Sequence, residues 1–392
     1  MTEESKNAAE DYRRQRQSAD AYRNGFRYTT ETFDKWLARN EQLLRDIIKA
    51  NGTSDADVEQ VLEGYKSYIA AAPPGSQFDD KNARAILGQI LQDIERLCRE
   101  QKIPIRNGVV YGVAPELGLL AGQREVIETD VSIIDVSMPF LAFCNCVSKL
   151  IARTLPHERE PSIDERKSLT KVSNDPAAVV ARLRASPELI GEWILIVLHF
   201  ACGWLPPSLI KPPPDQAGQV TRIFLLKSME WFALAHEYGH HVMKHGQATS
   251  SSEETYNVLR DEHEADIFAR AASIALGDRA EPPNLYAMFG VGGVIVLGMM
   301  DMVRRARWVL ETGADNVSAD KSHPPLADRI NVFGLLDQML PEELRPMATD
   351  MRNCFLKIIE GIWESVLPAI QQGHRDGVRP AEAANQPGWL PS

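Results

Sequence analysis

The chain has 392 residues, of which 44% are hydrophobic and 25% charged, a balance typical of a folded globular protein rather than of a disordered one. Its 43 Lys and Arg against 54 Asp and Glu give a formal net charge of −11, and an acidic chain is a poor binder of the nucleic-acid backbone. We therefore expect no nucleic-acid partner.

The N-terminal region is predicted to be helical. Apolar residues recur there at three- and four-residue spacing over residues 33–47, 58–65 and 86–97. The basic stretch Arg13–Arg16 is expected to lie on a solvated helix face. Because this region shows no catalytic or metal-binding pattern, residues 1–103 are predicted to be a helical accessory region.

The chain shows no pattern for export or membrane insertion. The charged N-terminus precedes no apolar run, so no secretory signal is expected. The longest apolar stretch, Ala287–Met300, has 14 residues including four glycines, and we interpret it as a buried core helix. A membrane span needs about 20 such residues. The five cysteines include no Cys-x-x-Cys pair, as is typical of free thiols in a reducing compartment. We therefore expect a cytoplasmic protein without a membrane span.

Two segments beyond the accessory region have the pattern of strands. Residues 109–111 and 131–136 are rich in β-branched side chains and are bounded by Gly, Pro or charged residues, so any sheet is predicted to be small. Residues 157–174 are predicted to form a loop and residues 205–214 an extended connection, and helical periodicity dominates the rest up to residue 372. The sequence thus predicts one mainly α (α+β) domain at 104–372, followed by a mobile tail at 373–392.

The most informative segment is Phe232–His241, which contains the pattern His-Glu-x-x-His. Two histidines four residues apart lie on one helix face and can both bind one Zn²⁺. His236 and His240 continue an apolar stripe that includes Leu225 and Met229, so they are expected to face the interior, where unpaired imidazoles are costly. The alternative is a pair of core histidines that hydrogen-bond to neighbours.

The third ligand separates the classes of zinc peptidase. The metzincin pattern requires Gly and His where this chain has Met243 and Gly246, so that class is excluded. His241 and His245 project from other faces of the helix. We expect them either to be exposed to solvent or to support the metal ligands from outside.

A second helix offers the missing ligand. Glu262 and Asp266 are four residues apart and share a face, with Ala265 between them permitting close helix packing. Glu262 can complete the zinc site, and Asp266 can accept a hydrogen bond from the outer nitrogen of a zinc-bound histidine. The alternative is an exposed acidic helix face. His263 and Glu264 are weaker candidates for the third ligand.

Together with the segment Ser322–Ile330, these two motifs give the chain a resemblance to a known group. Over residues 222–335 it resembles the gluzincin peptidases related to HtpX and the CaaX prenyl proteases, which are typically embedded in membranes. More loosely, it resembles the phage-exclusion peptidases of the Lit type, in which a unit like Val131–Arg153 precedes the first motif. The resemblance implies that the zinc ligands are His236, His240 and Glu262 and that Glu237 is the general base. It also implies that Asp266 accepts a hydrogen bond from a zinc-bound histidine and that His323 lies near the substrate carbonyl.

Two residues after the second motif have alternative interpretations. His323 is either a hydrogen-bond donor to the oxyanion, a fourth zinc ligand, or simply a loop histidine that precedes a proline. Arg329 is expected to anchor that loop through a carboxylate. Neither role follows from the spacing alone.

The sequence as a whole predicts a zincin-like domain with a small β-sheet beside the His-Glu-x-x-His helix. The predicted function is zinc-dependent hydrolysis of peptide bonds in a protein or peptide substrate, which can be one specific intracellular protein. We expect the substrate to lie extended along residues 131–136 as an edge strand. The alternative is a catalytically silent zincin-fold scaffold in a complex.

Overall fold

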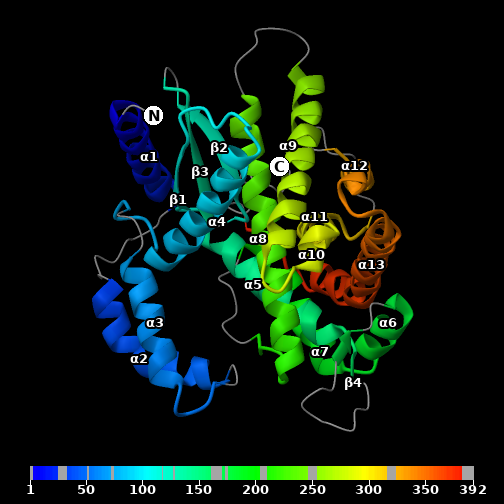
Figure 1. The fold of residues 1–392 in the computed structure, drawn as a ribbon. Coiled ribbons are helices and arrows are strands. Elements are labelled where there is room, and N and C mark those ends of the chain that lie inside the picture. The colour runs from blue at the N-terminus through cyan, green and yellow to red at the C-terminus, as the bar shows by residue number, and fades with distance from the viewer. Residues whose placement is uncertain are drawn as a thin grey trace.

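The computed structural model describes residues 3–24, 33–50, 53–71, 75–116, 118–126, 129–159, 170–172, 175–203, 210–245, 254–315 and 324–381. Helices dominate this part of the chain, and a three-stranded sheet lies among them, between the N-terminal helix and the central helices (Figure 1). The prediction of a mainly α fold with a small sheet is confirmed.

Four helices precede the sheet: α1 (Glu3–Arg23), α2 (Phe33–Ala50), α3 (Val58–Ala70) and α4 (Lys81–Glu100). The predicted apolar segments at 33–47, 58–65 and 86–97 fall within α2, α3 and α4. The Asp80 side chain accepts a hydrogen bond from the backbone N–H of Ala83, which caps the start of α4. Helices α2 and α3 pack against each other, and α1 packs against the sheet (Figure 1).

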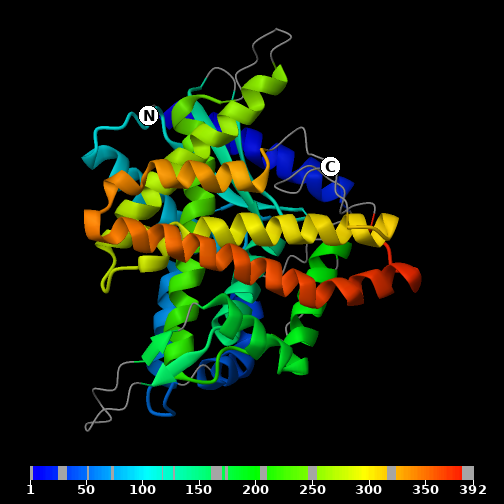
Figure 2. The same ribbon diagram turned by 90° about the vertical axis from the view of Figure 1, so that its right-hand side faces the viewer.

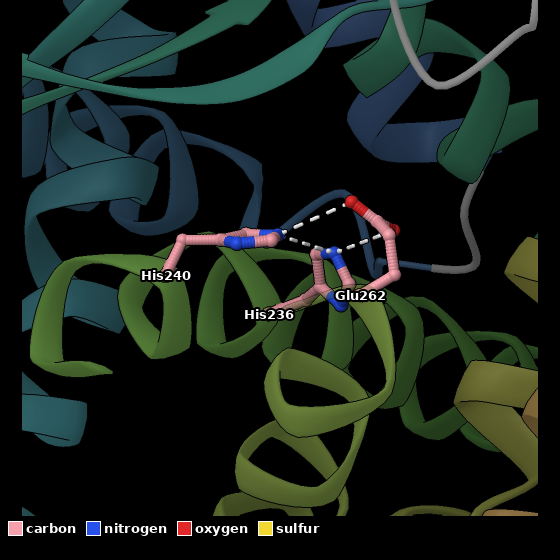
Figure 3. A group of neighbouring side chains, drawn as sticks. All are labelled: His236, His240 and Glu262. Carbon is pink, nitrogen blue, oxygen red and sulfur yellow. Dashed lines mark hydrogen bonds and ion pairs between the residues drawn. The ribbon is translucent and has the colours of Figure 1, made fainter. Parts of the chain in front are cut away.

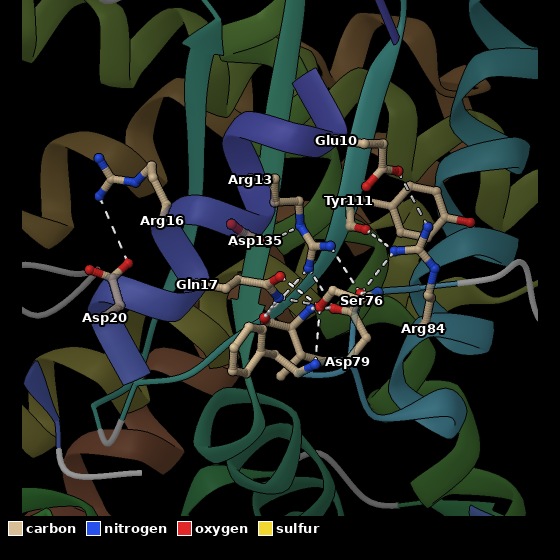
Figure 4. A network of polar contacts seen from close by, with 12 residues as sticks. Glu10, Arg13, Arg16, Gln17, Asp20, Ser76, Asp79, Arg84, Tyr111 and Asp135 are labelled. Atoms are coloured by element: carbon tan, nitrogen blue, oxygen red, sulfur yellow. Dashed lines mark hydrogen bonds and ion pairs between the residues drawn. The ribbon is translucent and has the colours of Figure 1, made fainter. Parts of the chain in front are cut away.

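Helix α1 is held to the sheet by a buried polar network (Figure 4). Arg13 is 0% exposed, and its guanidinium donates to Asp79 at 2.5 Å and to Asp135 at 2.7 Å. Gly112 leaves the space for this group, since a Cβ there would lie 2.0 Å from Arg13 Nη2. The prediction that Arg13 lies on a solvated face is therefore wrong, because two carboxylates neutralise its charge inside the protein.

The sheet consists of β1 (Val109–Ala114), β2 (Ala121–Val126) and β3 (Val131–Ser137) in the order β1-β3-β2. Strand β1 is parallel to β3, and β2 is antiparallel to it. The expectation that residues 131–136 form an edge is wrong, because β3 is paired on both sides. The sequence pattern missed β2, whose residues 122–125 are Gly-Gln-Arg-Glu and lack β-branched side chains.

Two further strands, β4 (His157–Arg159) and β5 (Thr170–Val172), form a small antiparallel pair. The prediction of a loop at 157–174 is therefore wrong at these two strands. The remaining α-helices in the described residues are α5 (Met138–Thr154), α6 (Pro176–Arg184), α7 (Pro187–Cys202), α8 (Gln216–Met243), α9 (Glu254–Arg279), α10 (Leu285–Met288), α11 (Val291–Thr312), α12 (Leu326–Leu335) and α13 (Arg345–Arg375). Two short 3-10 helices, η2 (Asp337–Met339) and η3 (Glu342–Leu344), lie between α12 and α13. Helix α8 is central, because α4, α5, α9, α11 and β2 all pack against it. Helices α11 and α13 lie side by side, and α11 packs against α8 (Figure 2).

The apolar stretch Ala287–Met300 forms the end of α10 and the first half of α11, and its residues are buried. Among the described residues, no single helix is long and apolar enough to cross a membrane. Helices α6 and α7 reach that length and composition only as a pair, and they meet at a bend of 97°.

Candidate metal centre

Three side chains from α8 and α9 converge on one point (Figure 3). The Nε2 atoms of His236 and His240 lie 3.1 Å apart. The carboxylate of Glu262 completes the group, with one oxygen 3.4 Å from His236 Nε2 and the other 3.4 Å from His240 Nε2. His236 is buried, whereas the side chains of His240 and Glu262 are 14% and 13% exposed, so the group is open to solvent on one side.

The donor set fits a zinc ion. Ligand atoms placed tetrahedrally about 2.1 Å from Zn²⁺ lie roughly 3.4 Å from one another. The two nitrogens lie 3.1 Å apart, and each lies 3.4 Å from a different oxygen of the Glu262 carboxylate, which is close to that spacing. Two imidazole nitrogens and one carboxylate oxygen form a ligand set typical of catalytic zinc sites, in which a fourth position stays open. His236, His240 and Glu262 could therefore hold such an ion.

The close approach of α8 and α9 depends on small residues. A Cβ added at Gly239 would lie 3.2 Å from the Cα of Ala265 and 3.1 Å from the Cβ of Phe268. Gly239 lies between the two histidines of α8, and Ala265 follows Glu262 on α9 by one turn. Small side chains at both positions bring the third donor within reach of the first two.

His236 is oriented by a buried carboxylate. Asp266, 0% exposed, lies with Oδ1 2.9 Å from His236 Nδ1. The guanidinium of Arg329 on α12 donates to both oxygens of Asp266 at 2.7 Å. Burial raises the pKa of Asp266, but the charge and hydrogen bonds of Arg329 outweigh burial and lower it below its ordinary value. An ionised Asp266 accepts from His236 Nδ1–H, which leaves the Nε2 lone pair facing the metal position.

Without a metal ion, His236 holds a proton more tightly than an ordinary imidazole does. Burial lowers the pKa of His236, but hydrogen bonds to Asp266 and Glu262 dominate and raise it to about 9. Burial raises the pKa of Glu262, and hydrogen bonds from His236 and His240 reverse this and hold it well below its ordinary value. A metal ion must therefore displace a proton from this group.

Glu237 follows His236 on α8 and is 3% exposed. Burial lowers the pKa of Arg329, and the charge of Glu237 is among those that raise it. The Glu237 carboxylate and the Arg329 guanidinium therefore lie within electrostatic reach of each other. Glu237 thus belongs to the same buried polar cluster as the three metal-binding candidates.

His241 anchors the end of α8 to the sheet. It is 0% exposed, with Nδ1 2.8 Å from Ser132 Oγ and Nε2 3.2 Å from the carbonyl oxygen of Ile105. Ser132 Oγ in turn accepts a hydrogen bond from the Gln123 amide at 2.7 Å. Burial lowers the pKa of His241 to about 4, so the ring is neutral at physiological pH. The expectation of solvent exposure is wrong for this residue, because the end of α8 packs under β3.

Other candidates lie apart from the three-residue group or beyond the described residues. Glu264 lies near His245 together with Asp261, a residue that the sequence pattern did not single out. His323 lies outside the described residues.

The comparisons with known proteins point to a peptidase. Residues 174–342 match the model of the family Peptidase U49, and this segment includes α8, α9 and α12 with every residue of the candidate centre. No curated protein and no solved structure matches the chain. The family match supports a protease.

Proposed function

We propose that the chain is a zinc-dependent endopeptidase of the gluzincin type, with a zincin-like catalytic domain. The observation that carries this proposal is the convergence of His236, His240 and Glu262 at separations of 3.1–3.4 Å. It is supported by the position of this group within the segment that matches Peptidase U49. The assignment of the three residues as ligands of one Zn²⁺ is part of the proposal.

Zinc, when bound, supplies a Lewis acid that activates water and polarises a carbonyl oxygen. Glu237 takes the proton of the attacking water on its carboxylate and delivers it to the nitrogen of the leaving amine. Asp266 keeps the His236 proton on Nδ1, and Arg329 keeps Asp266 ionised. The resemblance to the HtpX group implies that His323 lies near the substrate carbonyl. If His323 donates a hydrogen bond to the developing oxyanion, His323→Ala should lower kcat more than it raises KM.

The substrate is proposed to be a protein or peptide that binds along β2. Among the described strands, β2 pairs only with β3 and packs against α8. The hydrogen bonds from Gln123 to Ser132 and between Ser132 and His241 fix this strand relative to the metal-binding helix. An extended peptide that adds to β2 would pass beside the metal centre. A single intracellular protein in the cytoplasm remains our proposed target.

The competing function is that of a scaffold that has kept the fold without catalysis. A scaffold has no use for Glu237, which is not a metal ligand in our assignment and directly follows His236 on α8. Its retention beside three intact ligand positions favours the peptidase.

The test uses Glu237→Gln, which removes the proton acceptor and keeps the shape of the side chain. We expect normal folding and zinc content, with cleavage of a casein-type substrate reduced by roughly two to four orders of magnitude. Glu230→Gln is the matched control on the same helix and should cleave at the wild-type rate. Undiminished cleavage by the Glu237 variant would rule out the proposed mechanism. A proteome-wide comparison of cells that express the wild type or Glu237→Gln would then identify the substrate.

A further inference from the structure

His245 is turned back onto the end of the metal-binding helix. Helix α8 ends at Met243, and Lys244 adopts a left-handed conformation with φ 61°. The backbone N–H of His245 consequently donates to the carbonyl oxygen of His240 at 3.1 Å. This turn brings the two rings together, with centroids 5.0 Å apart and Nδ1 atoms 2.9 Å apart.

The other nitrogen of His245 faces two carboxylates on α9. His245 Nε2 lies 3.1 Å from Glu264 Oε2 and 3.7 Å from Asp261 Oδ1. The imidazole is 7% exposed, so these contacts are largely shielded from water. By its donor atoms alone, the group of His245, Asp261 and Glu264 could hold a metal ion of its own.

The tautomer of one histidine dictates that of the other. A neutral imidazole carries one proton, and two facing Nδ1 atoms share only one hydrogen. If His240 binds zinc through Nε2, its proton is on Nδ1 and is donated to His245 Nδ1. His245 then carries its own proton on Nε2 and donates it to Glu264. A metal ion on His245 Nε2 would need that nitrogen without a proton.

We propose that His245 is a positioning residue for the metal centre and not a ligand of a second metal ion. It accepts the Nδ1–H of His240, which fixes the ring of His240 with its Nε2 lone pair toward the metal position. Glu264 completes the chain by accepting the proton of His245 Nε2. This role rests on the proposed zinc site. His245 orients the ring of His240 as Asp266 orients the ring of His236.

The test measures zinc binding to the full chain, independently of peptidase activity. Zinc alone is titrated in competition with a chromophoric chelator, and bound zinc is counted at saturation. His245→Ala should weaken zinc affinity about 10- to 100-fold, the usual effect of removing a group that orients a metal ligand. His245→Asn places an oxygen near the position of Nδ1, and it should restore most of that loss. His374→Ala is the matched control, since His374 on α13 hydrogen-bonds to the carbonyl oxygen of Leu310.

A second variant and a spectroscopic readout keep the test decisive if His245→Ala folds poorly. Glu264→Ala, at a side chain that is 40% exposed, should weaken zinc affinity several-fold while leaving the circular dichroism spectrum unchanged. In the zinc-loaded wild type, ¹⁵N NMR of labelled histidines should show His240 protonated at Nδ1 and His245 protonated at Nε2. These results would support the positioning role.

Three outcomes would overturn it. Two zinc ions per wild-type chain, falling to one in His245→Ala, would make the second group a metal site. One zinc per chain, bound with equal affinity by the wild type, His245→Ala and Glu264→Ala, would refute the positioning role of His245. The proposed peptidase function would be unaffected by that result. No zinc in the wild type would refute the zinc site itself, and with it this role.

Discussion

Replacing Asp266 by Asn should destabilise the protein strongly even without metal. The carboxylate of Asp266 receives the Arg329 guanidinium at 2.7 Å on each oxygen and lies 2.9 Å from His236 Nδ1. Asparagine offers one oxygen and an amide that is itself a donor, so at least one buried N–H would face another donor. Arg329, whose side chain is 7% exposed, would lose its nearest ionised partner and keep the more distant Glu262 at 3.5 Å and the charge of Glu237.

The expected cost is about 3–5 kcal/mol, the range for breaking a buried ion pair by removing one partner. Substituting Met for Arg329 in the same chain removes the stranded charge. The double variant should therefore be more stable than the sum of the two single losses predicts, by about 1–3 kcal/mol.

The assay is urea-induced unfolding followed by circular dichroism, with a chelator present so that metal binding does not contribute. Asp301→Asn is the control, because Asp301 pairs with Arg304 on α11 at a site about one-quarter exposed. That change should cost less than about 1 kcal/mol. A loss below about 1 kcal/mol for Asp266→Asn, or strictly additive losses in the double variant, would refute the reasoning.

Three further predictions follow from the structure. Burial raises the pKa of Glu230 to about 7, so the folded chain holds a proton that the unfolded chain releases above its ordinary pKa. Stability should fall by up to about 3 kcal/mol as the pH rises from 4.5 to 7. Glu230→Gln should flatten this dependence in urea titrations, and an unchanged slope would contradict the assignment. Gly239→Ala should move α8 away from α9 and so weaken zinc binding. Its packing should cost about 1–3 kcal/mol of stability, against about 1 kcal/mol gained from the higher helix preference of Ala. Wild-type affinity in that variant would show that the contact is not tight. A chelator should lower the Tm of the wild type, because an ion that binds only the folded chain stabilises it, but not that of Glu262→Ala. Equal shifts in both proteins would contradict the ligand set.

The proposed ligands could be named from the sequence because each pair depends on local periodicity. In α8, His236 and His240 are one helical turn apart, and so are Glu262 and Asp266 in α9, so each helix fixes its own pair. The close approach of the two helices depends in part on the small residues Gly239 and Ala265. The family resemblance then joined the pairs into one site.

The positions of β2, Arg13 and His245 could not be predicted in this way, because each depends on contacts distant in sequence or on a rare backbone conformation. Strand β2 is polar and is held by pairing with β3. Arg13 is buried by partners 66 and 122 residues away. His245 reaches His240 only because Lys244 takes a left-handed conformation, which residues other than glycine rarely adopt.

The metal content of the purified chain tests the central claim most directly. Mass spectrometry of the wild type, alongside Glu262→Ala with the same fold by circular dichroism, should find about one zinc per wild-type chain and a sharply lower content in the variant. Full zinc in Glu262→Ala would contradict the ligand assignment and turn attention to His263 or Glu264. A wild-type chain that takes up no zinc, even when zinc is supplied, would contradict the proposed peptidase mechanism itself.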